Sequence, residues 1–386
     1  MKTEIFTTKD TGQFLTYLSK LNKNNSSFLL IFAPVHLVDE KLLKEIQKNI
    51  NFDYVVVSAA AVLDKKEFKE NFIQSIFFQF EKKGKINVFY KENLSLNYEH
   101  ISDFLEKKLK ETQTNIIFST TSNVALNMII DKLGFFDGNT ILAGGIASSN
   151  HPKFLTKLIY NGNTIKDGFV LLQFENVYSS VTVSSGFVPV GPAYKITKSH
   201  LNRIYEIDGI SSYFFLEKIL RGTGLSPEDL DMEKTSKYLW SFPFIVIEKN
   251  FGHMTFCRTP KEYSEKEGAF KFWGNFDIGD RIKISIGDPE DIVETTELDV
   301  KIFKYHLMEI NAKPEFILNF SCVARYELLK KSQLQNEEAK IFRRLFLSTP
   351  VAGMLTFGEI APDKTEKKIN FYNQTSVLVA LWESDV

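Results

Sequence analysis

Long apolar runs that flank amphipathic stretches recur along this chain. The first run covers Phe28–Ala33, apolar residues at helical spacing follow between 37 and 46, and a second run covers Tyr54–Ser58. A continuous apolar run is typical of a parallel strand buried on both faces, and helical spacing between two such runs is typical of a crossover helix. The pattern therefore predicts a βαβ unit over residues 28–62.

Two later segments have the same order of parts, over residues 115–148 and 316–361. Both carry a Phe-Ser pair at the end of the first run and a Gly-x-Ile-Ala sequence near the end of the unit. Either an internal duplication or the general likeness of βαβ units explains this similarity.

Between these units the pattern changes to short alternating segments. Residues 165–196 alternate between apolar and polar positions with Gly and Pro between the runs, which is typical of an antiparallel sheet. A helix is predicted over Ser211–Leu220, and further short strands over Phe242–Glu297. We therefore expect a mixed α/β (α+β) fold whose βαβ units form mixed sheets. No Ser/Gly-rich linker is present, so two tightly packed halves are expected, residues 1–200 and 201–386.

Composition and charge narrow the classes of function. Of 386 residues 44% are hydrophobic and 25% charged, which is usual for a globular protein. A net charge of −1 and a pI near 6.6 give no electrostatic reason to bind nucleic acid or an anionic membrane. Cys257 and Cys322 cannot form a disulfide framework, and no run reaches 18 apolar residues. A cytoplasmic protein that contacts neither nucleic acid nor membrane is predicted.

An ordered series of short motifs extends from about residue 28 to the C-terminus. It consists of Gly144-Gly145-x-Ala147, Ser185-Gly186-x-x-Pro189-x-Gly191, Tyr205-Glu206-Ile-Asp208-Gly209, Arg258-Thr-Pro, Gly268, Gly274, Ile278-Gly-Asp280, Phe320-Ser-Cys322-x-x-Arg325, Gly358-Glu359-Ile-x-Pro362 and Asn373-x-Thr375.

This series resembles the FIST family of sensory domains, over both its N-terminal and C-terminal regions, in a stand-alone member of prokaryotic type. The resemblance implies a small-ligand sensor, with amino acids or their relatives as expected ligands and a separate signalling partner protein. Some members are reported as haem-dependent nitric oxide sensors, which makes haem a second ligand class. One departure lies at residues 58–62, where Ser-Ala-Ala-Ala-Val replaces a more polar turn common in the family.

The last unit carries the polar residues with the most specific chemistry. Cys322 follows a predicted strand and opens a predicted helix, where backbone N–H groups and the helix dipole lower the pKa of a thiol. It is either a ligand-contacting or reactive thiol, or a small buried residue. Arg325, one turn further along, either clamps a ligand carboxylate or forms an ion pair with Glu327 or Glu337.

The remaining candidates lie in turns and at strand ends. Glu359, after Gly358, either binds a ligand ammonium or forms a buried ion pair with Arg325. Asn373, in the predicted last strand, lines the pocket or satisfies backbone groups. The pair Gly144-Gly145 either allows close approach of a ligand to the backbone or forms a tight turn. The predicted ligand-binding set is Cys322, Arg325, Glu359, Gly358, Asn373, Gly144 and Gly145.

Signatures of cofactors and enzymes are few. The six histidines, His36, His100, His151, His200, His253 and His306, lack the spacing of a zinc site, so no metal is predicted. His200 is the first candidate for a haem ligand, and the many Phe residues can supply apolar walls for haem. The chain has no P-loop, no GxSxG and no full GxGxxG.

These observations predict a small-ligand-binding sensory protein without intrinsic catalysis. The first alternative is a haem-binding gas sensor, and the second is a cysteine-dependent enzyme that uses Cys322. No cofactor is firmly predicted, and no pattern in the sequence predicts an oligomeric state.

Overall fold

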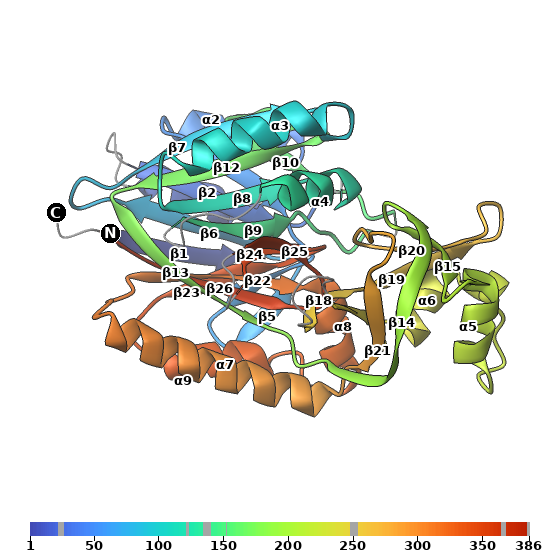
Figure 1. Ribbon diagram of the computed structural model, residues 1–386. Coiled ribbons are helices and arrows are strands. Elements are labelled where there is room, and N and C mark those ends of the chain that lie inside the picture. The colour runs from blue at the N-terminus through green and yellow to red at the C-terminus, as the bar shows by residue number, and fades with distance from the viewer. Residues whose placement is uncertain are drawn as a thin grey trace.

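The computed structural model describes residues 1–21, 27–120, 123–133, 140–151, 153–247, 254–363 and 368–383. Figure 1 shows a larger body that contains both ends of the described chain, with a smaller lobe beside it. The lobe runs from β14 (Val188–His200) to β21 (Arg281–Ile286). It is inserted between β13 (Val177–Ser184) and α7 (Pro289–Glu309), which both belong to the body.

The three predicted βαβ units are confirmed, and each lies in a different six-stranded sheet of mixed direction. The predicted mixed α/β class is therefore correct. In the first unit β2 (Ser27–Ala33) pairs with β3 (Tyr54–Ser58), and α2 (Glu40–Asn49) lies between them. In the second unit β8 (Thr114–Ser119) pairs with β9 (Ile141–Ile146), and the crossover holds α4 (Asn123–Lys132). In the third unit β22 (Phe316–Cys322) pairs with β23 (Val351–Thr356), and the crossover holds α8 (Val323–Lys331) and α9 (Glu337–Leu345).

The three sheets repeat one order of strands: β1-β6-β2-β3-β10-β11, β7-β12-β8-β9-β24-β25 and β13-β26-β22-β23-β4-β5. In each sheet two antiparallel strands flank the parallel pair on one side and a hairpin flanks it on the other. That hairpin always comes from another unit. The additional strands are β1 (Lys2–Thr8), β4 (Ala61–Asp64), β5 (Glu67–Glu70), β6 (Ile73–Gln79), β7 (Lys85–Glu92), β10 (Leu158–Tyr160), β11 (Asn163–Ile165), β12 (Gly168–Glu175), β24 (Glu359–Pro362), β25 (Ile369–Tyr372) and β26 (Ser376–Glu383).

A pair of glycines supports an internal duplication of the second and third units. Gly144 lies opposite Ile117 and Gly353 opposite Asn319, at the same place in their parallel pairs. A Cβ at either glycine would clash with the carbonyl oxygen of the facing residue. The two Gly-x-Ile-Ala sequences were expected to occupy equivalent positions in the second and third units, but they do not. The second one begins β24, which pairs antiparallel with β9 and places Glu359 opposite Gly145.

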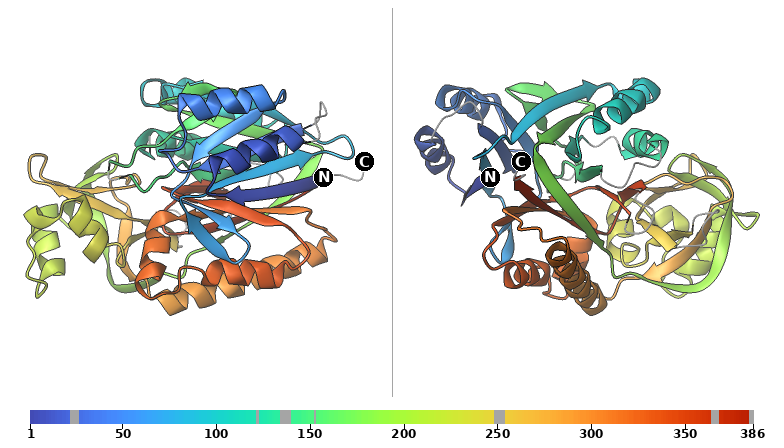
Figure 2. Two further views of the ribbon diagram at one scale, coloured as in Figure 1. Left: turned by 180° about the vertical axis from the view of Figure 1, so that it is seen from behind. Right: turned by 60° about the vertical axis from the view of Figure 1, so that its left-hand side comes forward.

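The strands are buried on both faces because they separate one inner core from three outer cores. Alternate residues of all three sheets meet inside, where the Phe118 ring lies 5.9 Å from that of Phe32 and 5.7 Å from that of Phe320. Outside, α1 (Thr11–Lys20) and α2 cover the first sheet, α3 (Leu94–Leu109) and α4 the second, and α7 and α9 the third. Figure 2 (right) shows these three groups of helices around the strands.

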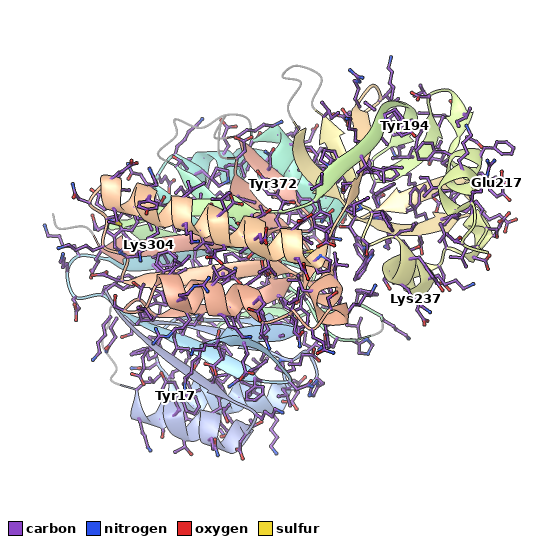
Figure 3. All side chains as sticks on the ribbon, turned by 90° about the horizontal axis from the view of Figure 1, so that it is seen from below. Tyr17, Tyr194, Glu217, Lys237, Lys304 and Tyr372 are labelled. Atoms are coloured by element: carbon purple, nitrogen blue, oxygen red, sulfur yellow. The ribbon has the colours of Figure 1, made fainter. Side chains whose placement is uncertain are left out.

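The lobe is built on one eight-stranded antiparallel sheet with its own aromatic core. In Figure 3 it carries the labelled Tyr194, Glu217 and Lys237. The predicted helix near Ser211–Leu220 is α5 (Ser212–Leu220). The other elements are β15 (Arg203–Ile207), β16 (Ile210–Ser211), a 3₁₀ turn (Pro227–Asp229), α6 (Met232–Tyr238), β17 (Phe244–Ile247), β18 (Met254–Arg258), β19 (Pro260–Ser264) and β20 (Ala269–Phe272).

Two short segments, 185–187 and 287–288, carry the chain from body to lobe and back. They touch, because a Cβ at Gly287 would overlap the ring of Phe187. The predicted division at residue 200 is not tested and stays a prediction, but strands from both sides of it share three of the four sheets. None of the helices in the described ranges is long and apolar enough to cross a membrane.

Candidate functional site

A small cavity lies where the lobe meets the body, at the end of the parallel pair β22–β23. Its volume is about 20 Å³, which holds one water molecule. The cavity in this state is therefore too small for a larger molecule. Its lining comes from the lobe (Trp240, Thr259, Trp273) and from the body (Phe154, Cys322, Val323, Ala324, Thr356, Phe357, Asn373).

Aromatic rings form one wall of the cavity. The Phe154 ring lies 5.6 Å from Trp273 and 5.3 Å from Phe357, measured between ring centroids. The Trp273 and Phe357 rings are nearly parallel, 14° apart with centroids separated by 6.5 Å. The Lys261 ammonium lies 4.6 Å from the Trp273 centroid, and burial lowers the pKa of this lysine.

The remaining lining exposes few polar atoms, and much of it comes from the start of α8. Cys322 is the N-cap of α8, and Val323 and Ala324 of the first turn also line the cavity. Thr259 of the lobe lines the same cavity and is 2% exposed. Its Oγ1 has no hydrogen-bond partner among the described residues. A buried hydroxyl without a partner costs stability, so it indicates a place where a ligand or water belongs.

A hydrogen-bonded carboxyl group lies beside the cavity lining, next to Thr356. Glu359 is fully buried, with Oε1 2.7 Å from the Thr356 hydroxyl and Oε2 2.8 Å from the Thr375 hydroxyl. No cation forms an ion pair with it within the described ranges. Burial raises the pKa of Glu359 to about 8, while the bonds from Thr356 and Thr375 act in the opposite direction.

The hydrogen-bond geometry is compatible with a protonated Glu359. The Thr356 hydroxyl lies near two acceptors, the carboxyl of Glu359 and the carbonyl oxygen of Ser321 at 3.2 Å. A threonine has one hydroxyl proton. If Glu359 is protonated, it donates to Thr356 Oγ1, and Thr356 in turn donates to Ser321. With a pKa of about 8, Glu359 is mostly protonated at neutral pH and can then donate this hydrogen bond.

The prediction of a lowered thiol pKa at Cys322 is wrong. Burial raises this pKa strongly, and the nearby Glu359 raises it further. Backbone N–H groups at the start of α8 do favour the thiolate, as expected from the helix terminus, but burial outweighs them. Cys322 is a neutral thiol in the cavity wall, so a cysteine-dependent reaction loses its main chemical support.

Arg325 does not face the cavity, so the expected carboxylate clamp is not formed by this side chain. It is fully buried and pairs with Glu338 of α9 at 2.9 Å. It also donates to Thr296 of α7 at 2.6 Å and to the carbonyl oxygen of Ser185. The alternative prediction, an ion pair of Arg325, is correct, but its partner is Glu338 and not Glu327 or Glu337. The reason is that Arg325 lies on the inner face of the helix.

The structure brings most other predicted residues close to the cavity. Gly145 lies against Thr356 and Gly358, where a Cβ would be 2.6 Å from the Thr356 methyl group. Asn373 lines the cavity and accepts a bond from the Thr259 N–H at 3.3 Å. It precedes β26 instead of lying in a strand, which corrects the expected last strand. Gly144 serves strand packing.

The histidine candidates lie elsewhere. His200 is exposed at the end of β14, in the hairpin with β15, and does not line the cavity. His253 lies outside the described residues. No group of metal-binding side chains occurs in the described ranges. The haem alternative stays a prediction that no observation here tests.

Sequence reasoning missed the residues that the lobe contributes. Thr259 lies in the Arg258-Thr-Pro motif, but it had no assigned role. Its neighbour Arg258 is buried, donates to the carbonyl oxygen of Phe371 at 2.7 Å, and occupies space that Gly274 leaves free. Two of the three Trp residues, Trp240 and Trp273, line the cavity. The rarity of Trp in this chain was the one sequence feature that could have drawn attention to these two residues.

Family models match the chain in two parts, the FIST N domain over residues 27–210 and the FIST C domain over residues 215–362. The chain belongs to the FIST family, whose domains are sensory domains of signal transduction. An uncharacterized protein of Aquifex aeolicus (strain VF5) is 30% identical over 189 residues, 46% of this chain. This chain covers 66% of that relative's length.

Proposed function

We propose that this protein is a sensor that binds an amino acid or a similar small polar metabolite in the cavity between lobe and body. The unpartnered, buried Thr259 hydroxyl, in a cavity that the first turn of α8 also lines, carries this proposal. The FIST family supports a sensory rather than a catalytic role.

The two walls of the cavity suit the two ends of such a ligand. A helix N-terminus favours an anionic group, and the Thr259 hydroxyl can donate a second bond to it. The Trp273 and Phe357 rings suit an apolar or planar part. Because Glu359 is neutral, it does not repel a ligand carboxylate.

Binding of an amino acid requires the cavity to open. A volume of about 20 Å³ is far below the several hundred Å³ of ordinary ligand sites. The chain passes between lobe and body at only two short segments in the described ranges. Movement of the lobe is therefore the simplest opening, and it requires bonds such as that from Arg258 to the Phe371 carbonyl oxygen to break or shift. A ligand that touches both parts then changes the position of the lobe, and a separate partner protein can detect that change.

A calorimetric and thermal-shift screen of amino acids tests the proposal. Thr259→Val keeps the shape and removes the hydroxyl, so we expect affinity for the responding amino acid to fall about tenfold to a hundredfold. Thr235→Val is the matched control, because Thr235 is also buried with an unpartnered hydroxyl but lies in α6 of the lobe. No response to any amino acid, or equal affinity in Thr259→Val, contradicts the proposal.

A further inference from the structure

Aromatic side chains are concentrated around the cavity between lobe and body. They make up four of its ten lining residues, Phe154, Trp240, Trp273 and Phe357, whereas aromatic residues are 13% of the whole chain. The rings of Phe154, Trp273 and Phe357 have centroids 5.3–6.5 Å apart, the range in which aromatic pairs attract each other. Asn123 of α4 holds two of them, because its Nδ2 donates to the carbonyl oxygens of Trp273 and Phe357 at 3.4 and 3.3 Å. A further ring, supplied by a ligand, can add to this cluster.

The groups that suit an anion lie directly beside these rings. The backbone N–H of Trp273 donates to the carbonyl oxygen of Thr259 at 3.0 Å, so the ring and the unpartnered hydroxyl come from neighbouring residues. The N-terminus of α8, which begins after Cys322, lines the same cavity and favours a negative charge. A ligand that contacts both features therefore carries its anionic group only a few bonds away from its ring.

Two cationic side chains lie next to these groups. The Lys261 ammonium is 4.6 Å from the Trp273 ring centroid. Arg258, which directly precedes Thr259, is buried and donates to backbone carbonyl oxygens. Glu359 beside the cavity is mostly protonated at neutral pH. A group of aromatic rings can also hold a quaternary ammonium ion, but these neighbours disfavour a ligand whose only charge is positive.

We infer that the ligand of this cavity is a carboxylate that carries an aromatic ring a few bonds away, as the aromatic amino acids do. This inference rests on the proposed function and narrows its class of ligand. The carboxylate accepts from the Thr259 hydroxyl and from N–H groups at the start of α8, and the ring packs on Trp273 and Phe357. Because Trp273 belongs to the lobe and Phe357 to the body, a ring that packs on both connects the two parts.

Calorimetric titration of the intact chain with matched ligands tests this class. Phenylalanine should bind about threefold to tenfold more tightly than cyclohexylalanine, which has a similar shape without the aromatic faces. Phenethylamine, which lacks the carboxylate, should bind at least about tenfold more weakly than phenylalanine. Titration with 3-phenylpropionate, which lacks the ammonium, distinguishes an amino acid from a deaminated acid. Binding of phenylalanine with or without binding of 3-phenylpropionate supports the inference.

A tryptophan variant tests the role of the aromatic rings. In Trp273→Leu the ratio of the affinities for phenylalanine and cyclohexylalanine should fall to about one. Such a ratio does not depend on the fraction of the variant that is folded. Trp382→Leu is the matched control, because Trp382 is the third tryptophan of the chain, lies in β26 and does not line the cavity. It should keep the preference for phenylalanine.

The outcomes separate this inference from the proposed function. Cyclohexylalanine or leucine that binds as tightly as phenylalanine overturns the inference and leaves an amino acid sensor in place. A preference for phenylalanine that Trp273→Leu leaves unchanged overturns it as well, and so does choline that binds more tightly than phenylalanine. If no amino acid binds and 3-phenylpropionate does not bind either, the inference and the proposed function both fail.

Discussion

Replacement of Glu359 by glutamine should stabilise this protein at neutral pH, although it alters a fully hydrogen-bonded buried group. A glutamine side chain has nearly the shape of a protonated glutamate, and its amide can donate to Thr356 Oγ1 as the carboxylic acid does. Its carbonyl oxygen can accept from the Thr375 hydroxyl. The Glu359→Gln variant therefore keeps the neutral hydrogen-bond pattern and loses only the ability to ionise.

The size of the effect follows from the pKa of Glu359, about 8 in the folded protein against 4.5 as its ordinary value. Below pH 4.5 the carboxyl is protonated in both states and imposes no penalty. Between pH 4.5 and 8 the unfolded chain releases the proton and the folded chain retains it, so stability falls by about 1.4 kcal/mol per pH unit. At pH 7 the wild type has therefore lost about 3 kcal/mol that the glutamine variant retains.

Urea denaturation of both proteins at pH 4.5, 6 and 7.5 measures this difference. The free energy of unfolding of Glu359→Gln relative to wild type should rise steadily with pH. Glu338→Gln is the matched control, because Glu338 is equally buried but paired with Arg325, and it should destabilise throughout this range. A Glu359→Gln difference that does not vary with pH would show that Glu359 is ionised in the folded protein and would refute the reasoning.

Three further predictions concern residues of the third βαβ unit. Arg325→Ala leaves Glu338 buried without its cation and should cost about 3–5 kcal/mol in denaturant unfolding, whereas replacing both residues by apolar ones should cost much less; equal losses would argue against a structural pair. Cys322 should react with iodoacetamide at neutral pH only after unfolding, as mass spectrometry can show, and rapid labelling of the folded chain would contradict its raised pKa. Gly353→Ala should lower the thermal midpoint by several degrees because its Cβ meets the Asn319 carbonyl oxygen, and an unchanged midpoint would mean that the strands can separate at no cost.

The parallel strands could be predicted from the sequence because each one is a short run of consecutive apolar residues. Runs such as Phe28–Ala33 face core on both sides, so every position is apolar. Which hairpin completes which sheet was not predictable. The segments β24 and β25 follow the third unit in the chain but complete the sheet of the second. Such pairing depends on contacts between residues more than 200 positions apart, which periodicity cannot show.

The candidate site was predicted in part. The position of Cys322 at a strand end is correct, because the pattern of strand and helix fixes it. Its pKa was predicted in the wrong direction, since burial under residues that include those of the lobe raises it and the charge of Glu359 raises it further. Arg325 was assigned to the wrong face of α8 because Glu338 arrives from another helix. Neighbours that lie far away in the sequence determined both outcomes.

Because the three sheets exchange hairpins, each sheet of the body needs strands from another unit to be complete. The first unit gives β4–β5 to the third sheet, the second gives β10–β11 to the first, and the third gives β24–β25 to the second. A chain cut after the FIST N match would leave β4–β5 without a sheet to join and β9 with an open edge. We therefore expect the two matched regions to be stable only together, as one unit of folding and of inheritance.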